Sequence, residues 1–86
     1  MSFQLSIVSP GGKIFDDTVD SLSVPGVEGG FEVYSQHMPL ISVLKAGKAR
    51  VRKNDHVTAY EITSGILEVS PQHDVLLLAD EITPVS

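Results

Sequence analysis

Apolar and polar residues alternate along most of this chain, and this alternation is the feature that most constrains its fold. Near the start, Phe3, Leu5 and Ile7 are separated by the polar residues Gln4 and Ser6. Because side chains of a β-strand point to opposite faces in turn, this pattern gives a strand one buried face. The alternation recurs in residues 31–34 and 48–52, and residues 56–63 are rich in the β-branched and aromatic residues that suit a strand. No segment keeps the 3.6-residue period of an amphipathic helix, so the sequence predicts an all-β protein.

Turn signals cut the chain into short segments. Pro10-Gly11-Gly12, Asn54-Asp55 and Ser70-Pro71-Gln72 each separate two extended segments. Many short strands with frequent turns are typical of a β-sandwich or a β-barrel. Two packed sheets would let the apolar faces meet. We therefore expect a single domain over residues 1–86.

Three other segments carry local predictions. The glycine-rich residues 26–30 should form a loop with positive-φ positions. Residues 40–44 and 75–79 are nearly continuous apolar runs, which indicate strands buried on both faces. Residues 81–86 should form a frayed terminus.

Composition excludes several classes of function. The chain has 86 residues and no cysteine, so disulfides, thiolate metal sites and thiol catalysis are excluded. A formal charge of −5 argues against nucleic-acid binding. No apolar run approaches the roughly 20 residues of a membrane-spanning helix, and we see no signal peptide, so we expect no direct membrane insertion.

One basic segment stands out; it is either a solvated strand face or a docking patch for an acidic partner. Its members are Lys45, Lys48, Arg50, Arg52 and Lys53.

The sequence lacks the usual motifs of catalysis and ligand binding. The three histidines are too scattered for a metal site; they are His37, His56 and His73. The carboxylate-rich residues 16–20 have Ser21 where a calcium loop needs glycine. Residues 26–30 lack the Lys-Ser/Thr ending of a phosphate loop, and no serine lies in a nucleophile elbow. We therefore predict a non-enzyme with no catalytic residue, no metal, no cofactor and no small-molecule ligand.

The segment from Val24 to Leu40 resembles the signature of the epsilon subunit of F-type ATP synthases. Its parts are a glycine-bounded turn at Glu28-Gly29, a short strand, and then His37-Met38-Pro39-Leu40. Further matches follow in order along the chain, at residues 5–10, 45–51, 64–69 and 75–80. The resemblance implies a flattened sandwich or barrel of two packed, mainly antiparallel five-stranded sheets.

The resemblance also implies a function. The chain would be a central-stalk subunit of the rotor of a proton- or sodium-translocating ATP synthase. It would dock on the gamma subunit and on the c-subunit ring, and so couple ion-driven rotation to ATP synthesis. Its place would be peripheral, at the cytoplasmic face of a bacterial inner membrane.

Particular residues are implied for each contact. Those facing gamma would be Ser9, His37, Met38, Pro39 and Leu40. Those facing the c-ring would be Glu28, Gly29, Gly30, Phe31 and Glu32. For His37, the alternative is a turn residue that bonds locally.

The sequence departs from the family in two respects. Members often carry Glu at the position of Gly30 and Gly at that of Glu32, a swap that keeps the carboxylate on one strand face. Members usually continue into a helical hairpin that carries ATP-responsive inhibition and an ATP-binding motif. This sequence stops before that hairpin, so we expect no ATP binding; a naturally short subunit and an excised domain are both open.

Two alternatives remain open. The chain could be a generic β-sandwich interaction module of another complex. It could also be a small β-barrel ligand-binding protein, which would need an internal cavity with convergent polar groups.

Overall fold

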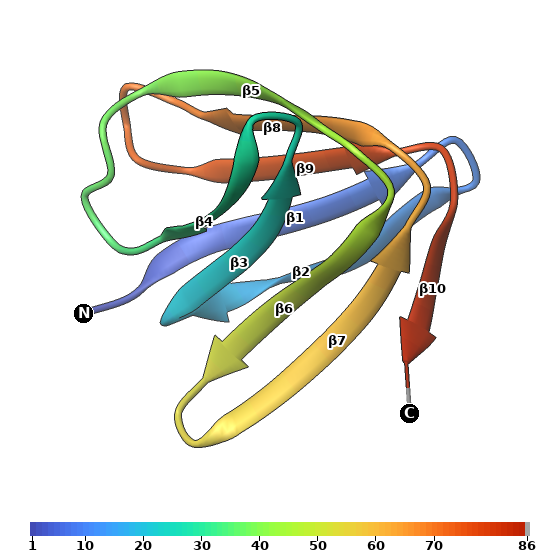
Figure 1. Ribbon diagram of the computed structural model, residues 1–86. Coiled ribbons are helices and arrows are strands. Elements are labelled where there is room, and N and C mark those ends of the chain that lie inside the picture. Colours follow the sequence, from blue (N-terminus) through green and yellow to red (C-terminus); the bar gives the residue numbers. More distant parts are fainter. Residues whose placement is uncertain (86) are drawn as a thin grey trace.

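The computed structural model describes residues 1–85, which form ten β-strands and no helix (Figure 1). Accordingly, no helix within that range is long and apolar enough to cross a membrane. The strands are β1 (Phe3–Ser9), β2 (Gly12–Val19), β3 (Ser21–Gly26), β4 (Gly29–Val33), β5 (Leu40–Leu44), β6 (Gly47–Lys53), β7 (His56–Ile62), β8 (Gly65–Val69), β9 (Val75–Ala79) and β10 (Ile82–Val85).

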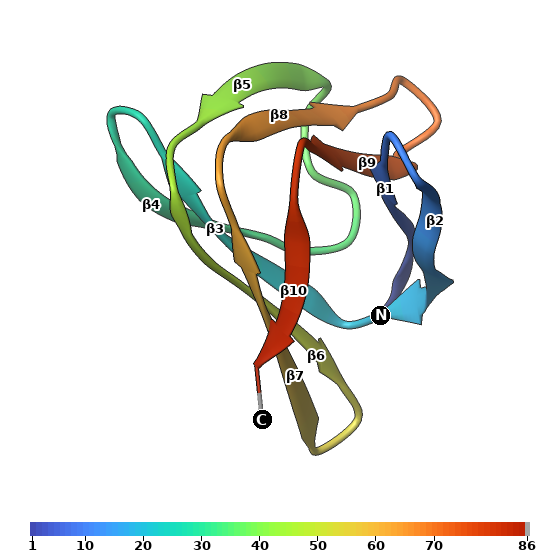
Figure 2. The same ribbon diagram turned by 90° about the vertical axis from the view of Figure 1, so that its right-hand side faces the viewer.

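The ten strands belong to one hydrogen-bonded sheet that folds back on itself into two layers (Figure 2). One layer has the order β5-β8-β9-β1-β2, and the other has the order β4-β3-β6-β7-β10. The residue pair Gly26 and Leu44 joins the layers. Among the described strand pairs, β1 and β9 are parallel and the others are antiparallel. The predicted pair of mainly antiparallel five-stranded sheets is confirmed.

The core lies between the two layers and follows from the alternating pattern. Leu5 and Ile7 of β1 and Leu67 of β8 are at most 1% exposed, and Leu22 of β3 meets them from the other layer at 0%. The other core residues are Phe3, Val19, Val24, Val33, Leu44, Ala49, Val51, Tyr60, Ile62, Val69, Val75, Leu77 and Ala79. Apolar side chains therefore fill the interior.

The tight turns lie at the predicted positions, but the turn within residues 26–30 is shorter than predicted. Gly12 and Asn54 have positive φ at the β1–β2 and β6–β7 turns. In residues 26–30, Gly29 has a φ of 130°, as expected, but β3 and β4 extend so far that only Val27 and Glu28 form the turn. A Cβ at Gly26 would lie 2.7 Å from the Gly29 carbonyl oxygen, so this close hairpin requires glycine there.

Two predictions about apolar and terminal segments were wrong. Residues 40–44 are not buried on both faces, because Ile41 is 74% and Val43 is 55% exposed. Within residues 75–79, Leu78 is 41% exposed. Residues 82–85 are not frayed: they form β10 against β7, with Ile82 packed on the core. Pro84 is tolerated because β10 is an edge strand. The expectation for Ser86 lies outside the described residues.

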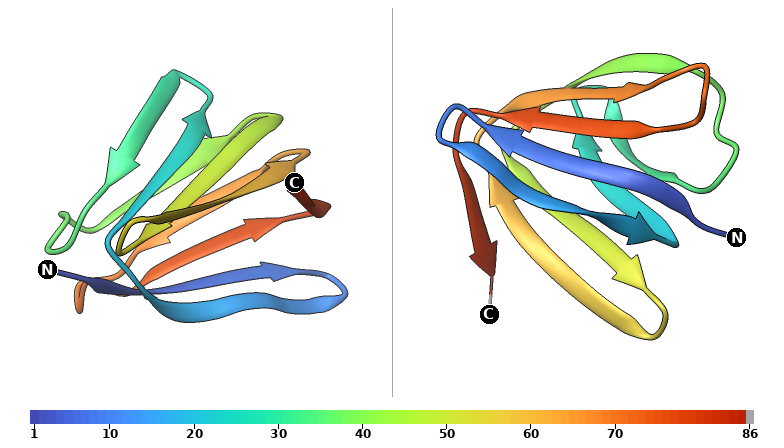
Figure 3. Two further views of the ribbon diagram at one scale, coloured as in Figure 1. Left: turned by 90° about the horizontal axis from the view of Figure 1, so that it is seen from below. Right: turned by 180° about the vertical axis from the view of Figure 1, so that it is seen from behind.

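The two layers also meet where β2 crosses β6 (Figure 3). The Lys53 ammonium lies 2.6 Å from the Asp17 carboxylate. The backbone N–H of Asn54 donates to the Asp20 carboxylate at 2.7 Å. Nearby, the rings of Phe15 and Tyr60 meet edge to face with centroids 6.4 Å apart. These contacts tie the free side of β2 to the second layer.

Candidate docking surface

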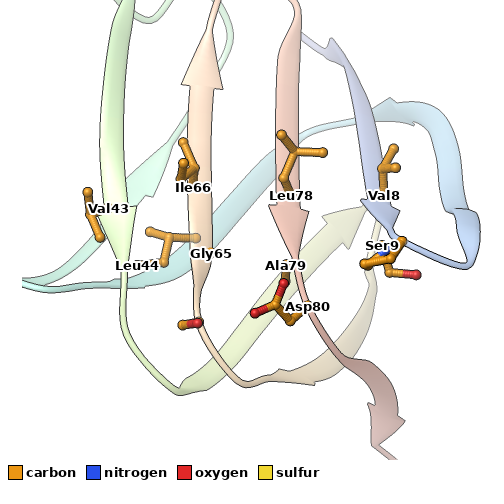
Figure 4. A pocket seen from close by; sticks show the side chains of 11 residues that line it. Val8, Ser9, Val43, Leu44, Gly65, Ile66, Leu78, Ala79 and Asp80 are labelled. Carbon is orange, nitrogen blue, oxygen red and sulfur yellow. The ribbon is translucent and has the colours of Figure 1, made fainter.

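A row of apolar side chains crosses the outer face of the first layer. Val43 of β5 is in register with Ile66 of β8, Ile66 with Leu78 of β9, and Leu78 with Val8 of β1. Residues in register on neighbouring strands share a face, and strands lie about 4.8 Å apart, so the row spans about 14 Å. We call these four residues the apolar row (Figure 4).

Three of the four side chains in the apolar row are exposed to solvent, and Val8 is half-buried. Val43 is 55%, Ile66 is 44% and Leu78 is 41% exposed, and Ile41 beside the row is 74% exposed. The row borders a shallow hollow that also includes Ser9 and Gly65. Contiguous exposed apolar side chains on a small domain are typical of a surface that another molecule covers.

Gly65 keeps the strands of this face close together. A Cβ on Gly65 would lie 2.1 Å from the carbonyl oxygen of Leu78. No side chain tolerates that distance, so glycine lets β8 and β9 pair without a bulge at the end of the apolar row.

The predicted gamma-facing residues lie at two ends of this face. Ser9 lines the hollow at the end of β1. Met38 and Pro39 lie in the connection between β4 and β5, and Met38 is 76% exposed. Leu40 begins β5 and is partly buried against the core. The structure therefore joins the two groups through Ile41 and Val43, which lie between them along β5.

His37 uses one ring nitrogen inside its own connection. Its Nδ1 lies 2.9 Å from the carbonyl oxygen of Met38, so Nδ1–H is the donor in this bond. The local bond expected of a turn residue is thus present. It leaves Nε2 free for a different contact, and the assignment of His37 to a gamma interface stays a prediction.

The predicted c-ring residues lie on the β3–β4 hairpin. Glu28 is exposed in its turn, and Gly29 and Gly30 are exposed at the start of β4. Phe31 packs against the core instead of facing outward. Glu32 is exposed and accepts a hydrogen bond at 3.0 Å from the hydroxyl of Tyr34, which raises the pKa of that phenol. The two carboxylates are the parts of this segment available to a polar partner.

The basic segment is partly committed to ion pairs within the chain. Lys53 pairs with Asp17, and the hydrogen bond from its ammonium lowers the pKa of that carboxyl. Arg52 lies 3.8 Å from the carboxylate of Asp20. Lys48, Arg50 and Arg52 alternate with buried residues along β6. The basic segment therefore has the properties of a solvated strand face. Its binding to an acidic partner stays a prediction.

On β2, a second carboxylate is also tied to a lysine. Lys13 lies 2.9 Å from Asp16, and its hydrogen bond lowers the pKa of that carboxyl. Among residues 1–85, no three His, Cys, Asp or Glu side chains gather as a metal site would require.

Sequence reasoning missed most of the docking surface. Val8, Ile41, Val43, Ile66 and Leu78 were not singled out, although all of them lie in extended segments that were recognised. Their signal was present as an excess of apolar residues: 40–44 and 75–79 carry them at consecutive positions instead of alternate ones. Such a run was interpreted as burial on both faces, which a neighbouring molecule can also provide.

Comparison with known proteins identifies the family. Residues 2–85 match the family described as "ATP synthase, Delta/Epsilon chain, beta-sandwich domain". The chain belongs to this family. The ATP synthase epsilon chain of Chlorobium limicola is 36% identical over 80 residues, which cover 92% of this chain and 91% of that relative. The epsilon chain of Aquifex aeolicus is 40% identical over 78 residues, covering 91% and 58%. That of Protochlamydia amoebophila is 37% identical over 86 residues, covering 99% and 58%.

Solved structures agree on the epsilon-type fold. A chain of the Euglena gracilis mitochondrial ATP synthase (OSCP/F1/c-ring) superposes with a TM-score of 0.91 at 20% identity, covering 96% of this chain and 53% of that one. A chain from the Tetrahymena thermophila central stalk/c-ring gives 0.81 at 13% identity, covering 95% and 66%. This chain thus spans little more than half the length of several members that it matches.

Proposed function

We propose that this chain is a non-catalytic central-stalk subunit of an ATP synthase, which docks on the gamma subunit and the c-ring and couples rotation to ATP synthesis. Its family membership supports this role, and so does its similarity to curated relatives named ATP synthase epsilon chain. The structural neighbours come from assemblies described as containing a central stalk or c-ring. The three curated relatives named above are bacterial, which supports a peripheral place on the cytoplasmic side of a bacterial membrane.

The apolar row is the observation that carries the proposal. A stalk subunit has to hold its partner rigidly, and a sheet face with apolar side chains in register offers a preformed surface for this. Burying this face would release apolar area from water. In our proposal the apolar row and Ile41 contact gamma, together with Ser9 and residues 37–40.

A second contact is proposed at the β3–β4 hairpin. Glu28 and Glu32 would face polar groups of the c-ring, and Gly29 and Gly30 would let the partner backbone approach closely. Phe31 would act indirectly, because its side chain packs on the core and holds the hairpin in place. Gly26 leaves room for the ring of Phe31, because a Cβ on Gly26 would lie 3.0 Å from Cε1 of that ring.

The interior weighs against the ligand-carrier alternative. A ligand cavity needs a few convergent polar groups inside. Here the space between the layers is lined by apolar side chains, and the buried polar residue recorded among them is Ser21. The remaining alternative, a module of an unrelated complex, is decided by the identity of the partner.

The proposal is tested by binding and by function. Titration calorimetry with purified gamma should give a 1:1 complex. Adding the chain to ATP synthase depleted of its epsilon subunit should restore ATP-driven ion pumping, while the chain alone shows no ATP hydrolysis. Absence of gamma binding together with no restoration of pumping would refute the proposal.

A further inference from the structure

We propose that His73 is a positioning residue for the docking connection, the segment of residues 34–39 that carries His37 and Met38. His73 lies in the β8–β9 turn, some thirty-six positions along the chain from His37. Its Nδ1 lies 3.1 Å from the carbonyl oxygen of His37. The inference rests on the proposed function, because positioning matters only if this connection docks on a partner.

The β8–β9 turn presents His73 rigidly. Within the turn, the His73 N–H donates to the Ser70 carbonyl at 2.8 Å, and the Ser70 N–H donates to the Asp74 carbonyl at 2.9 Å. The Asp74 N–H donates to the Ser70 hydroxyl at 3.1 Å. These bonds fix the backbone on both sides of His73, so its ring projects from a closed turn instead of a loose loop.

His73 adopts a backbone conformation that is unfavourable for histidine. Its φ is 68°, in the left-handed region, where glycine meets no steric penalty. Turns of this kind usually have glycine or asparagine at such a position. A strained residue in a native structure is a reason to look for a role, and the ring contact of His73 supplies one.

The contact reaches a segment with few other constraints. Gln36 also has a positive φ, and the connection forms no strand pairing of its own. The His37 ring bonds within the connection, to the carbonyl oxygen of Met38. Among the side-chain hydrogen bonds described for residues 1–85, the Tyr34–Glu32 bond holds the start of the connection, and the bond from His73 anchors its middle from a different turn. Since a carbonyl can only accept, His73 must carry its proton on Nδ1.

Two substitutions separate positioning from turn stability. His73→Gly removes both the ring and the strain, so the melting temperature should hold or rise while affinity for purified gamma falls roughly threefold to tenfold, as expected for one lost hydrogen bond. His73→Asn should keep affinity within about twofold, because asparagine tolerates a positive φ and offers an amide donor at the place of Nδ1. Asn54→Gly is the matched control: it changes a left-handed residue at a different turn, and gamma affinity should not change.

Hydrogen exchange gives a readout that does not depend on gamma. In the ¹⁵N-labelled chain, His73→Gly should speed amide exchange at residues 36–38 and leave the strands unchanged. Unchanged exchange, wild-type affinity of the Gly variant, or equal losses in the Gly and Asn variants would each overturn the inference. If the wild-type chain fails to bind gamma while exchange still records the tether, the proposed function has failed, and the docking role of His73 fails with it.

Discussion

Replacing Val43 and Ile66 together by serine should weaken gamma binding strongly and leave the fold intact. Fully burying an aliphatic side chain of this size stabilises by about 1.5–3 kcal/mol. Val43 is 55% and Ile66 is 44% exposed, so docking can bury about one full side chain between them. The loss of about 1.5–3 kcal/mol corresponds to a Kd raised about 10- to 150-fold.

The chain offers a control pair with the same exposures. Val57 on β7 is 55% exposed and Ile14 on β2 is 44% exposed, and neither belongs to the apolar row. Because the residue types and exposures match, the double serine variants of the control pair and of Val43/Ile66 should change the melting temperature by similar amounts. Its Kd for gamma should stay within about twofold of the wild-type value, because neither residue lies in the apolar row or beside it on β5, where docking buries apolar area.

Titration calorimetry at one salt concentration measures both Kd values and the heat-capacity change of binding. Loss of apolar burial should make that heat-capacity change less negative in the Val43/Ile66 variant only. The reasoning is refuted if the two double variants bind gamma equally well, or if the control pair loses affinity instead.

Three further predictions concern stability. Leu67→Ala should lower the free energy of unfolding by about 2–5 kcal/mol in urea titrations, because Leu67 is 0% exposed in the core. Gly65→Ala should lower the melting temperature clearly more than Gly30→Ala, because the new Cβ would lie 2.1 Å from a β9 carbonyl oxygen, compared with 3.5 Å from the nearest atom at Gly30. Asp17 has a lowered pKa in the folded chain, so its ion pair with Lys53 stabilises above about pH 4 and is lost as pH falls through the folded pKa. Between about pH 6 and about pH 2, the melting temperature of Lys53→Met should therefore fall less with decreasing pH than that of the wild type. An equal decrease in the two proteins would contradict this.

Much of the fold could be predicted because local and long-range preferences agree. The turns at Gly12 and Asn54 need positive φ, and the sequence has glycine and asparagine there. The alternation in residues 3–7 directly gives the core face of β1. The strand pairing itself was not predictable, since the parallel contact of β1 with β9 joins residues some seventy positions apart.

The error at the C-terminus has a similar cause. Residues 82–85 are Ile-Thr-Pro-Val, and the proline at the end of the chain outweighed the three β-branched residues in the sequence-based prediction. They become a strand because β7 offers an unpaired edge and Ile82 finds a place on the core. Local sequence does not record that edge, which exists only after β6 and β7 have paired.

The candidate site was the hardest part to predict, because an apolar residue can be buried by its own chain or by a partner. In β5, Leu44 is 1% exposed while Val43 next to it is 55% exposed, although both belong to one apolar run. The sequence alone assigns the same role to both. Once the strand register is known, the two residues can be assigned to opposite faces of the sheet. Leu44 belongs to the core, and Val43 lies on the solvent face in register with Ile66. A stable monomer does not need apolar side chains on that outer face, and retaining a row of them there raises the risk of aggregation. Their presence in register on four strands is therefore best explained by a partner that covers them.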